Sequence, residues 1–392
     1  MSEMSYLEKL LDGVEVEWLP LSDLARIRNG KDHKSLSEGE FPVYGSGGIM
    51  RYVDTYAYNK PSVLIPRKGS LGNLFFVNVP FWTVDTIFYT EIDEAQIRPK
   101  YLYYFLTTVG LGEMNQAGGV PSQTQSVLNK LKIPIPCPDN PEKSLAIQSE
   151  IVRILDKFSA LTAELTAELN MRKKQYNYYR DQLLSFKEGE VEWKTLGEVA
   201  KIQRGASPRP IVNYLTEQGN GIPWIKIGDT IPGSKYIDKT LQKITVEGAQ
   251  KSRILNPGDF VISNSMSFGR PYILRITGAI HDGWASISNF GEKLNADYLY
   301  HYLSSKKVKN YWESKINSGS VSNLNADIIK TLPVPLPDKQ KQERISALLD
   351  KFDTLTNSIT EGLPREIELR RKQYEYYRDL LFSFPKPETA SN

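Results

Sequence analysis

The stretch RKKQYNYYRDQLLSF at residues 172–186 decides the fold, because it returns almost unchanged as RRKQYEYYRDLLFSF at residues 370–384. The two copies lie 198 positions apart. In each copy, tyrosines spaced at i and i+3 share one face of a helix, while the lysines and arginines point outward. A coiled-coil seam with a soluble outer face is the simpler interpretation, and docking of a partner subunit is the alternative.

Working outward, further segments are duplicated in the same order. ILDKFSALT (154–162) returns as LLDKFDTLT (348–356), and YLYYFL (101–106) returns as YLYHYL (298–303). The openings GVEVEWLPLSDLARIRNG (13–30) and GEVEWKTLGEVAKIQRG (189–205) match. So do the proline clusters KIPIP (132–136) and TLPVPLP (331–337), which are interpreted as proline-rich linkers. The middles of the halves, about 31–99 and 207–295, share little. Two similar scaffolds that carry two different variable surfaces produce this pattern.

After each proline cluster the apolar residues adopt a helical period. In the first copy the stripe is Ile151, Ile154, Phe158, Leu161, Leu165, Leu169, Arg172, Tyr176, Tyr179 and Leu183. This heptad-like spacing, with one stutter, predicts a helix of ~40 residues and ~60 Å. Such a stripe is ordinarily core, and the most available partner is the helix of the second copy, so we expect an intramolecular antiparallel pair.

The second copy differs between LDKF and KQY, where it is four residues longer. EGLP at 361–364 falls in this interval and should break or kink the helix, because Pro364 lacks an N–H donor and clashes with the preceding turn. The N-terminal YLEKLLDGVEVEW (6–18) echoes the junction at 179–193, as if a third long helix had been cut off there.

The variable middles are predicted to contain both strands and helices. The runs rich in β-branched and aromatic residues predict strands: SVLIP (62–66), NLFFVNV (73–79), TIFYTEI (86–92), WIKIGD (224–229) and DFVISN (259–264). YLYYFL and YLYHYL predict amphipathic helices. The fold class expected is therefore α+β, with two mixed α/β domains and two long helices in approximate two-fold symmetry.

Composition narrows the class of protein. The chain has 392 residues, 40% hydrophobic and 24% charged, which is ordinary for a globular protein of two or three domains. A mean hydropathy of −0.40 and the lack of an apolar run of ~20 residues argue against a membrane protein. One cysteine and no signal peptide indicate the cytoplasm. The net charge of +3 is too small to indicate nucleic-acid binding by itself.

The motifs expected of an enzyme are absent from the sequence. NVPF (78–81) lacks the first of the two prolines of an amino-methyltransferase motif, and GSGG (45–48) and KGSLGN (68–73) are not followed by GK[ST]. Three histidines and one cysteine have no zinc-site spacing. His301 occupies the place of Tyr104 in the other half, which favours helix packing. We therefore expect no catalytic residues, no metal and no cofactor in this chain.

Binding chemistry is present on glycine-rich loops of both middles. Guanidinium, amide and hydroxyl groups read base edges, while lysines and backbone amides contact phosphates. A solvated charge is the simpler explanation for each residue alone, and His281 beside Asp282 is open between a DNA contact and a structural hydrogen bond. The loops PRKGSLGN and SNSMSFGR are stronger, because each places Gly near Ser and Arg just after a strand. The DNA-binding candidates are Arg28, Lys31, His33, Lys34, Ser46, Arg51, Arg67, Lys68, Ser70, Arg204, Arg209, Lys226, Lys235, Asn264, Ser265, Arg270 and His281.

Taken together, these paired motifs resemble the DNA specificity subunit of Type I restriction–modification systems over essentially the full length. The resemblance implies target-recognition domains at 1–142 and 189–338. It implies spacer helices at 143–188 and 339–385 that pair as an antiparallel coiled coil. The sequence adds a kink of the second helix near 361–364 and a disordered tail at 386–392.

The resemblance also implies a function and partners. Each recognition domain binds one half of a split, asymmetric sequence in double-stranded DNA. Two methyltransferase subunits, which hold S-adenosylmethionine, dock on the chain, and restriction and translocase subunits add ATP- and Mg-dependent cleavage. No membrane partner is implied. The rival interpretations are a stand-alone methyltransferase or nuclease and a structural coiled-coil scaffold without a DNA role.

Overall fold

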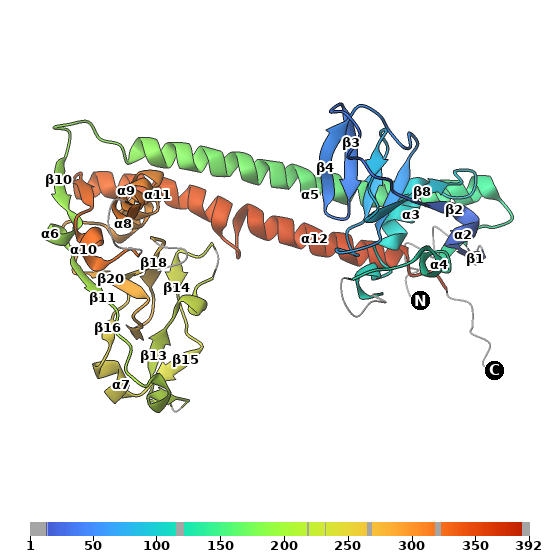
Figure 1. Cartoon of the computed structure of the whole chain (residues 1–392). Coiled ribbons are helices and arrows are strands. Elements are labelled where there is room, and N and C mark those ends of the chain that lie inside the picture. The colour runs from blue at the N-terminus through green and yellow to red at the C-terminus, as the bar shows by residue number, and fades with distance from the viewer. Residues whose placement is uncertain are drawn as a thin grey trace. The chain divides into compact units, whose positions relative to one another are not determined.

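The structure is a computed structural model that describes residues 13, 15–114, 121–217, 219–231, 233–264, 269–317 and 323–385 (Figure 1). The N-terminal helix remnant expected before residue 13 and the disordered tail expected at 386–392 lie outside these residues. The chain forms two compact units, residues 1–162 with 369–392 and residues 163–368. Each unit therefore combines a globular part with segments of both long helical regions.

The globular part of the first unit is built on small sheets. One has the order β2-β8-β5-β6 and another β4-β3-β7. The strands are β2 (Ala25–Asn29), β3 (Phe41–Gly45), β4 (Gly48–Val53), β5 (Ser62–Pro66), β6 (Phe75–Val77), β7 (Trp82–Thr83) and β8 (Ile87–Ile92), with the short helices α2 (Leu21–Leu24) and α4 (Gln125–Leu128) beside them. The predictions of strands at SVLIP, NLFFVNV and TIFYTEI are confirmed by β5, β6 and β8.

The second unit contains two five-stranded sheets, β11-β20-β17-β18-β14 and β12-β15-β13-β19-β16. The strands are β11 (Lys201–Arg204), β12 (Leu215–Thr216), β13 (Ile222–Ile225), β14 (Tyr236–Ile237), β15 (Gln242–Ile244), β16 (Arg253–Leu255), β17 (Phe260–Ser263), β18 (Pro271–Leu274), β19 (Gly278–Ile280) and β20 (Trp284–Ser288). The short helices are α6 (Leu196–Val199), α7 (Val246–Gln250), α9 (Lys306–Asn317) and α10 (Ala326–Lys330). The prediction at WIKIGD is wrong beyond Ile225. There the Asp229 carboxylate accepts from Lys226 N at 2.7 Å and closes a turn.

The proline clusters are strands rather than linkers. β1 (Val16–Pro20) pairs antiparallel with β9 (Lys132–Pro136), and Trp18 lies opposite Pro134. In the second unit β10 (Glu192–Thr195) pairs with β21 (Pro333–Leu336), and Trp193 lies opposite Pro335. Proline is tolerated because each sheet has only two strands, so one edge of each strand needs no ladder hydrogen bonds.

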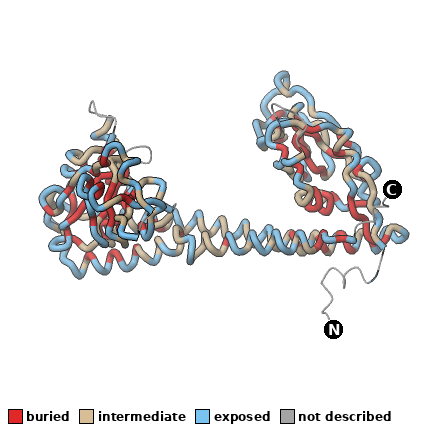
Figure 2. Tube along the Cα trace, turned by 90° about the horizontal axis from the view of Figure 1, so that it is seen from below, coloured by how far each residue is buried: buried red, intermediate tan, exposed pale blue. Residues whose placement is uncertain are grey.

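Two short helices form the centre of the two cores. They are α3 (Pro99–Leu106) and α8 (Ala296–Leu303). The amphipathic helices expected there are confirmed, and their apolar faces are broad, because α8 is buried from Tyr298 to Leu303 and α3 is buried except at Lys100 and Tyr103. Both helices are therefore enclosed by sheet on one side and long helix on the other. Figure 2 shows the buried residues concentrated in each globular part.

The first long helix is continuous and the second is interrupted. α5 runs from Pro141 to Leu183, whereas the second region divides into α11 (Lys339–Asn357) and α12 (Gly362–Leu381). The four residues between them equal the four that the second copy has in excess. Ser358 Oγ accepts from Glu361 N at 3.1 Å and stabilises the turn. Pro364 lies in the first turn of α12, where its missing N–H has no intrahelical role.

The long helices contact each other within each unit through duplicated residues. In the first unit Phe158 of α5 stacks on Tyr377 of α12, with ring centroids 5.2 Å apart. In the second unit Tyr179 of α5 stacks on Phe352 of α11, with centroids 5.6 Å apart. Phe158 and Phe352 belong to the two LDKF copies, and Tyr179 and Tyr377 to the two KQY copies. Each unit therefore pairs the LDKF segment of one repeat with the KQY segment of the other.

A duplicated glutamine fixes the start of each central helix. The Gln148 side chain accepts from Arg98 N at 2.8 Å, just before α3. The Gln342 side chain accepts from Asn295 N, also at 2.8 Å, just before α8. Both glutamines are about 1% exposed or less, so these hydrogen bonds are shielded from water. The long helix thus orients the same element in both units.

Candidate nucleic-acid interface

Each unit presents a polar loop directly after one buried strand. Arg67 follows β5 and Asn264 follows β17. Their backbone N–H groups donate to equivalent positions, Arg67 N to Thr86 O at 2.8 Å and Asn264 N to Gly283 O at 3.0 Å. The two units therefore place different side chains at the same point of a shared framework.

Two duplicated glycines allow the opening strand to end against the segment that precedes β8 in the first unit and β20 in the second. A Cβ on Gly30 would lie 1.9 Å from Val84 O, and one on Gly205 would lie 2.0 Å from His281 O. No other residue fits at that distance. Gly205 N also donates to Trp284 O at 2.8 Å. The glycine at the end of each opening motif is thus required by a close backbone approach.

In the second unit Asp282 gathers the candidate residues. Its carboxylate accepts from Ser207 Oγ at 2.8 Å and from the Arg209 guanidinium at 3.4 Å. Its backbone oxygen accepts from Asn264 Nδ2 at 3.3 Å and from Arg204 Nε at 3.5 Å. The hydrogen bond from Ser207 holds the pKa of Asp282 below its usual value, so the carboxylate stays charged at neutral pH.

His281 is held in one protonation state and one tautomer. Burial is the largest influence on its pKa and lowers it, so the ring is neutral at pH 7. Gly283 N donates to Nδ1 at 2.7 Å, so Nδ1 is the acceptor and the hydrogen is on Nε2. The ring lies 6.2 Å from those of both Trp224 and Trp284. Nε2 is therefore a fixed hydrogen-bond donor.

These groups line a cleft of about 530 Å³. Its walls are Arg204, Asn264, His281, Asp282, Gly283, Asn323, Leu324, Asn325 and Ala326. Asn264 Oδ1 is buried without a hydrogen-bond partner among the described residues, although its Nδ2 is engaged. An unpaired acceptor beside fixed donors is suited to an incoming donor such as a base amino group.

In the first unit the corresponding loop brings together Ser46, Arg67 and Lys68. Ser46 N donates to Thr86 Oγ1 at 3.3 Å, and Lys68 N donates to Thr86 O at 3.2 Å. Lys68 Nζ lies 3.7 Å from the Asp85 carboxylate and is largely exposed. Ser70 is exposed in the same loop. The loop and its neighbour Ser46 therefore contribute an arginine, a lysine and two hydroxyl groups to this part of the first unit.

The other candidates of the first unit belong to segments other than that loop. The Arg28 guanidinium pairs with Glu91 at 2.9 Å, and Arg51 donates to Leu36 O at 3.1 Å. Lys31, His33 and Lys34 share the segment after Gly30, where Lys31 and Lys34 are exposed. His33 Nδ1 is buried without a hydrogen-bond partner among the described residues.

Three candidates of the second unit also lie elsewhere. Lys226 Nζ donates to Gln242 Oε1 at 2.8 Å, and the Arg270 guanidinium lies over the Tyr272 ring at 5.3 Å. Lys235 is 7% exposed and its ammonium pairs with two carboxylates, so we leave it out of the interface. Ser265 lies outside the described residues.

Sequence reasoning missed three residues of this site. Ser207 and Asn323 hold or line the cleft of the second unit, and Thr86 holds the loop of the first. Their chemistry is ordinary, and each acts through a partner distant in the chain. The only available signal was the pair of asparagines before Ala326, typical of a helix start, where Asn325 caps α10.

Within the described part of the chain, no group of three or more His, Cys, Asp or Glu side chains is placed to hold a metal ion. Nor does the same part contain a helix long and apolar enough to cross a membrane.

Comparison with known proteins identifies relatives over the whole chain. Residues 13–172 and 188–369 each match the model of the Type I restriction modification DNA specificity domain. The chain is 46% identical over 411 residues to the Type I restriction enzyme EcoR124I/EcoR124II specificity subunit of Escherichia coli, covering 100% of both. It is 35% identical to a putative type I restriction enzyme specificity subunit of Haemophilus influenzae, covering 97% of this chain and 98% of the relative.

Solved structures agree on the fold. The S subunit of a Type-I restriction-modification system from M. genitalium matches with a TM-score of 0.60 and 16% sequence identity, covering 98% of this chain and 100% of that one. A second match, from a study of complex assembly and conformational transition of a type I system, has a TM-score of 0.58 at 17% identity, covering 94% and 97%.

Proposed function

Because the chain belongs to the Type I restriction–modification DNA specificity family, we propose that it reads a split, asymmetric sequence in double-stranded DNA, one half-site with each unit. The observation that supports this most is the shared strand-end loop with unlike side chains, Arg67 and Lys68 in one unit and Asn264 in the other. As a specificity subunit, the chain is not itself an enzyme, and its role is recognition.

The side chains at the two loops suit different base edges. A guanidinium such as Arg67 can donate two hydrogen bonds to guanine, while Lys68 suits a phosphate. Asn264 offers an unpaired Oδ1 to an amino group of adenine or cytosine, and His281 offers its Nε2–H to an acceptor. Unlike chemistry at equivalent places gives unlike half-sites.

The long helices set the distance between the half-sites. We assign recognition to 1–142 and 189–338 and spacing to 143–188 and 339–385, with the helices pairing as an antiparallel coiled coil. The stacked pairs Phe158–Tyr377 and Tyr179–Phe352 support this pairing. Since α5 is uninterrupted, its length can determine the number of bases between the half-sites.

Partner subunits supply the chemistry. A duplicated aromatic surface supports docking of two identical methyltransferase subunits, which hold S-adenosylmethionine. Tyr178 is 61% exposed and its repeat equivalent Tyr376 is 64% exposed. Each packs edge-on against the next tyrosine with centroids 5.4 and 5.3 Å apart. Restriction and translocase subunits, which use ATP and Mg, complete the assembly.

The direct test is DNA binding by the chain assembled with its methyltransferase partner. Methylated adenines mapped in the source genome give the motif for a duplex probe. We expect base changes in either half-site to weaken binding, changes in the spacer to have no effect, and affinity to fall steeply with salt. Equal affinity for probes lacking one half-site, or transfer of labelled methyl groups by the isolated chain, would contradict the proposal.

A further inference from the structure

A duplicated aspartate links the central helix of each unit to the long helix. Asp156 of ILDKF accepts from the Tyr104 hydroxyl at 2.6 Å. Asp350 of LLDKF accepts from His301 Nε2 at 2.8 Å, and His301 occupies the place of Tyr104. The His301 ring is 0% exposed, and its Nδ1 accepts from the Tyr176 hydroxyl at 2.9 Å. One polar joint therefore recurs in both units.

The cation at this joint comes from a different part of the chain in each unit. In the first unit it is Lys100 of α3, whose Nζ lies 2.8 Å from the Asp156 carboxylate. The equivalent position of α8 holds Asp297 instead. The cation of the second unit is Lys235, which precedes β14 in the variable segment and lies 115 residues from Asp350. The variable segment has thus taken over a role that the repeated helix fills in the first unit.

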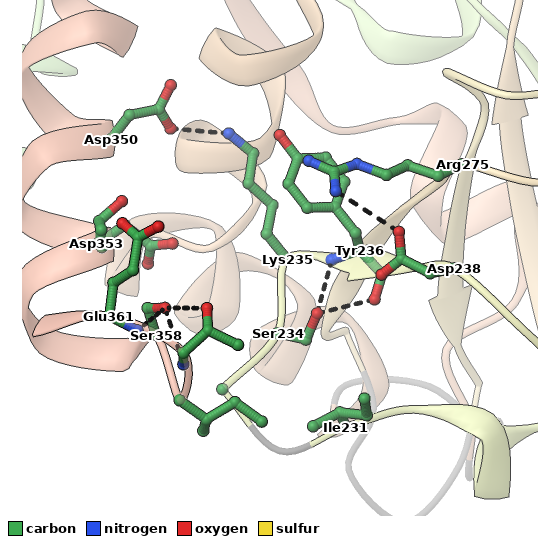
Figure 3. Close-up of a pocket in the computed structure, with 14 residues that line it drawn as sticks. Ile231, Ser234, Lys235, Tyr236, Asp238, Arg275, Asp350, Asp353, Ser358 and Glu361 are labelled. Carbon is green, nitrogen blue, oxygen red and sulfur yellow. Dashed lines mark hydrogen bonds and ion pairs between the residues drawn. The ribbon is translucent and has the colours of Figure 1, made fainter. Parts of the chain in front are cut away.

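Lys235 completes the joint by forming ion pairs with two carboxylates. Its Nζ lies 2.5 Å from Asp297 and 2.7 Å from Asp350. Figure 3 shows the side chain extending from the strand toward Asp350 across a pocket that the turn at Ser358–Glu361 also lines. Burial alone would lower the pKa of Lys235, but the hydrogen bonds from its ammonium to Asp297 and Asp350 raise it above the usual value. The side chain is charged, and its ammonium also lies 4.9 Å from the centre of the Tyr300 ring.

A close backbone approach holds the same segment beside α11. Gly233 has φ +84° and a Cβ there would lie 2.7 Å from Asn357 O, at the end of α11. β14 then pairs with β18, and β18 pairs with β17, which leads to Asn264. The contact at Lys235 is therefore connected through one sheet to the candidate cleft.

We propose that Lys235 is a positioning residue, which fixes the recognition sheet of the second unit on α8 and α11 by its ion pairs with Asp297 and Asp350. The inference rests on the proposed function and adds a compatibility rule to it. A variable segment transplanted between residues 207 and 295 must carry a lysine at this place. Otherwise the helix must supply the cation, as Lys100 does in the first unit.

The test moves the lysine of the second unit to the position that corresponds to Lys100 in the first unit. Lys235→Met removes the charge and keeps the length, leaving two carboxylates without a cation. The double variant Lys235→Met/Asp297→Lys places a lysine at the position equivalent to Lys100, within reach of Asp350. Lys239→Met, an exposed lysine four residues further along, is the matched control.

Two readouts are measured on the chain with its methyltransferase partner: the melting temperature and the Kd for duplexes with either half-site replaced. We expect Lys235→Met to lower the melting temperature and to weaken recognition of one half-site at least ~10-fold. The double variant should recover both to within about 3-fold of the wild-type Kd, and the control should match the wild type. Discrimination at the other half-site should not change.

The assignment is overturned if Lys235→Met melts and binds as the wild type does, or if the double variant is no better than the single one. If Lys235→Met fails to fold, the melting temperature of the double variant is sufficient to test the proposal, because rescue requires the contact with Asp350. A wild-type complex that discriminates no half-site would instead overturn the proposed function, while the melting series would still report on Lys235.

Discussion

Gly205→Ala tests the loop that carries the candidate residues of the second unit. The new Cβ would lie 2.0 Å from His281 O and 2.8 Å from the carbonyl carbon. To reach an ordinary contact, that oxygen must retreat by about 1.4 Å. The displaced peptide leads directly to Asp282, which holds Arg204, Arg209 and Asn264. We expect a loss of ~1–3 kcal/mol in the free energy of unfolding, as for other overpacked sites.

The effect on DNA binding should be larger at one half-site than at the other. A base contact with good geometry contributes ~1–3 kcal/mol of discrimination, so its loss corresponds to about 5–150-fold in Kd. The assay is titration of the complex with duplexes in which each half-site is replaced in turn. Discrimination should fall at the half-site of the second unit and persist at the other.

Two further variants complete this test. Gly291→Ala adds the same methyl group where no atom lies within 4 Å, and it should melt and bind as the wild type does. Gly30→Ala, whose Cβ would lie 1.9 Å from Val84 O, should impair the other half-site instead. Wild-type binding by Gly205→Ala, or an equal loss at both half-sites, would refute the reasoning.

Three other predictions address the helices, the variable segments and the polar joint. Inserting four residues into the uninterrupted α5 lengthens it by ~6 Å, nearly two base pairs, so methylome mapping should show a changed spacer and unchanged half-sites. Changed half-site bases would contradict this. Exchanging residues 31–99 for the segment of another family member should alter one half-site only, as the same mapping would reveal. Hydrogen bonds from His301 and the ion pair with Lys235 outweigh burial and hold the pKa of Asp350 below its usual value. The stability that it contributes is therefore present above pH ~4 and lost as the pH falls through the lowered pKa. The melting temperature of Asp350→Asn should therefore vary less with pH than that of the wild type in that acid range. An equal dependence of the two melting temperatures on pH would argue against the joint.

Much of the fold follows from the repetition in the sequence. The duplicated LDKF and KQY segments predict paired helices, and the stacked rings Phe158–Tyr377 and Tyr179–Phe352 are formed by those segments. The repeat also singles out Gly30 and Gly205, because a glycine recurs at the end of both opening motifs, and the structure places each of them in a close backbone approach.

Other features depend on contacts that no local pattern encodes. Lys235 was a plausible DNA ligand as a charge on a glycine-rich segment, but its partners Asp297 and Asp350 come from two helices far along the chain. The proline clusters looked like linkers because proline disrupts most strands, yet a two-stranded sheet leaves an edge free for it. The extensive burial of α3 and α8 likewise depends on the surrounding sheet and long helix as well as on their own sequence period.

The candidate interface was predictable in kind and only partly in detail. Asn264 directly follows β17, and Arg67 and Lys68 directly follow β5, as the sequence suggested. Asp282, which organises the second loop, was noticed only as a neighbour of His281. Its importance arises from hydrogen bonds to side chains 18 to 78 positions away.

We propose that one duplicated framework presents two different recognition surfaces to a single stretch of DNA. Mapping methylated adenines in the source strain and in a strain lacking this gene tests it most directly. We expect one motif to disappear in the strain that lacks the gene. That motif should consist of two different short sequences separated by a constant number of unspecified bases. A lost motif that is continuous or perfectly palindromic, or a methylation pattern that does not change, would contradict it.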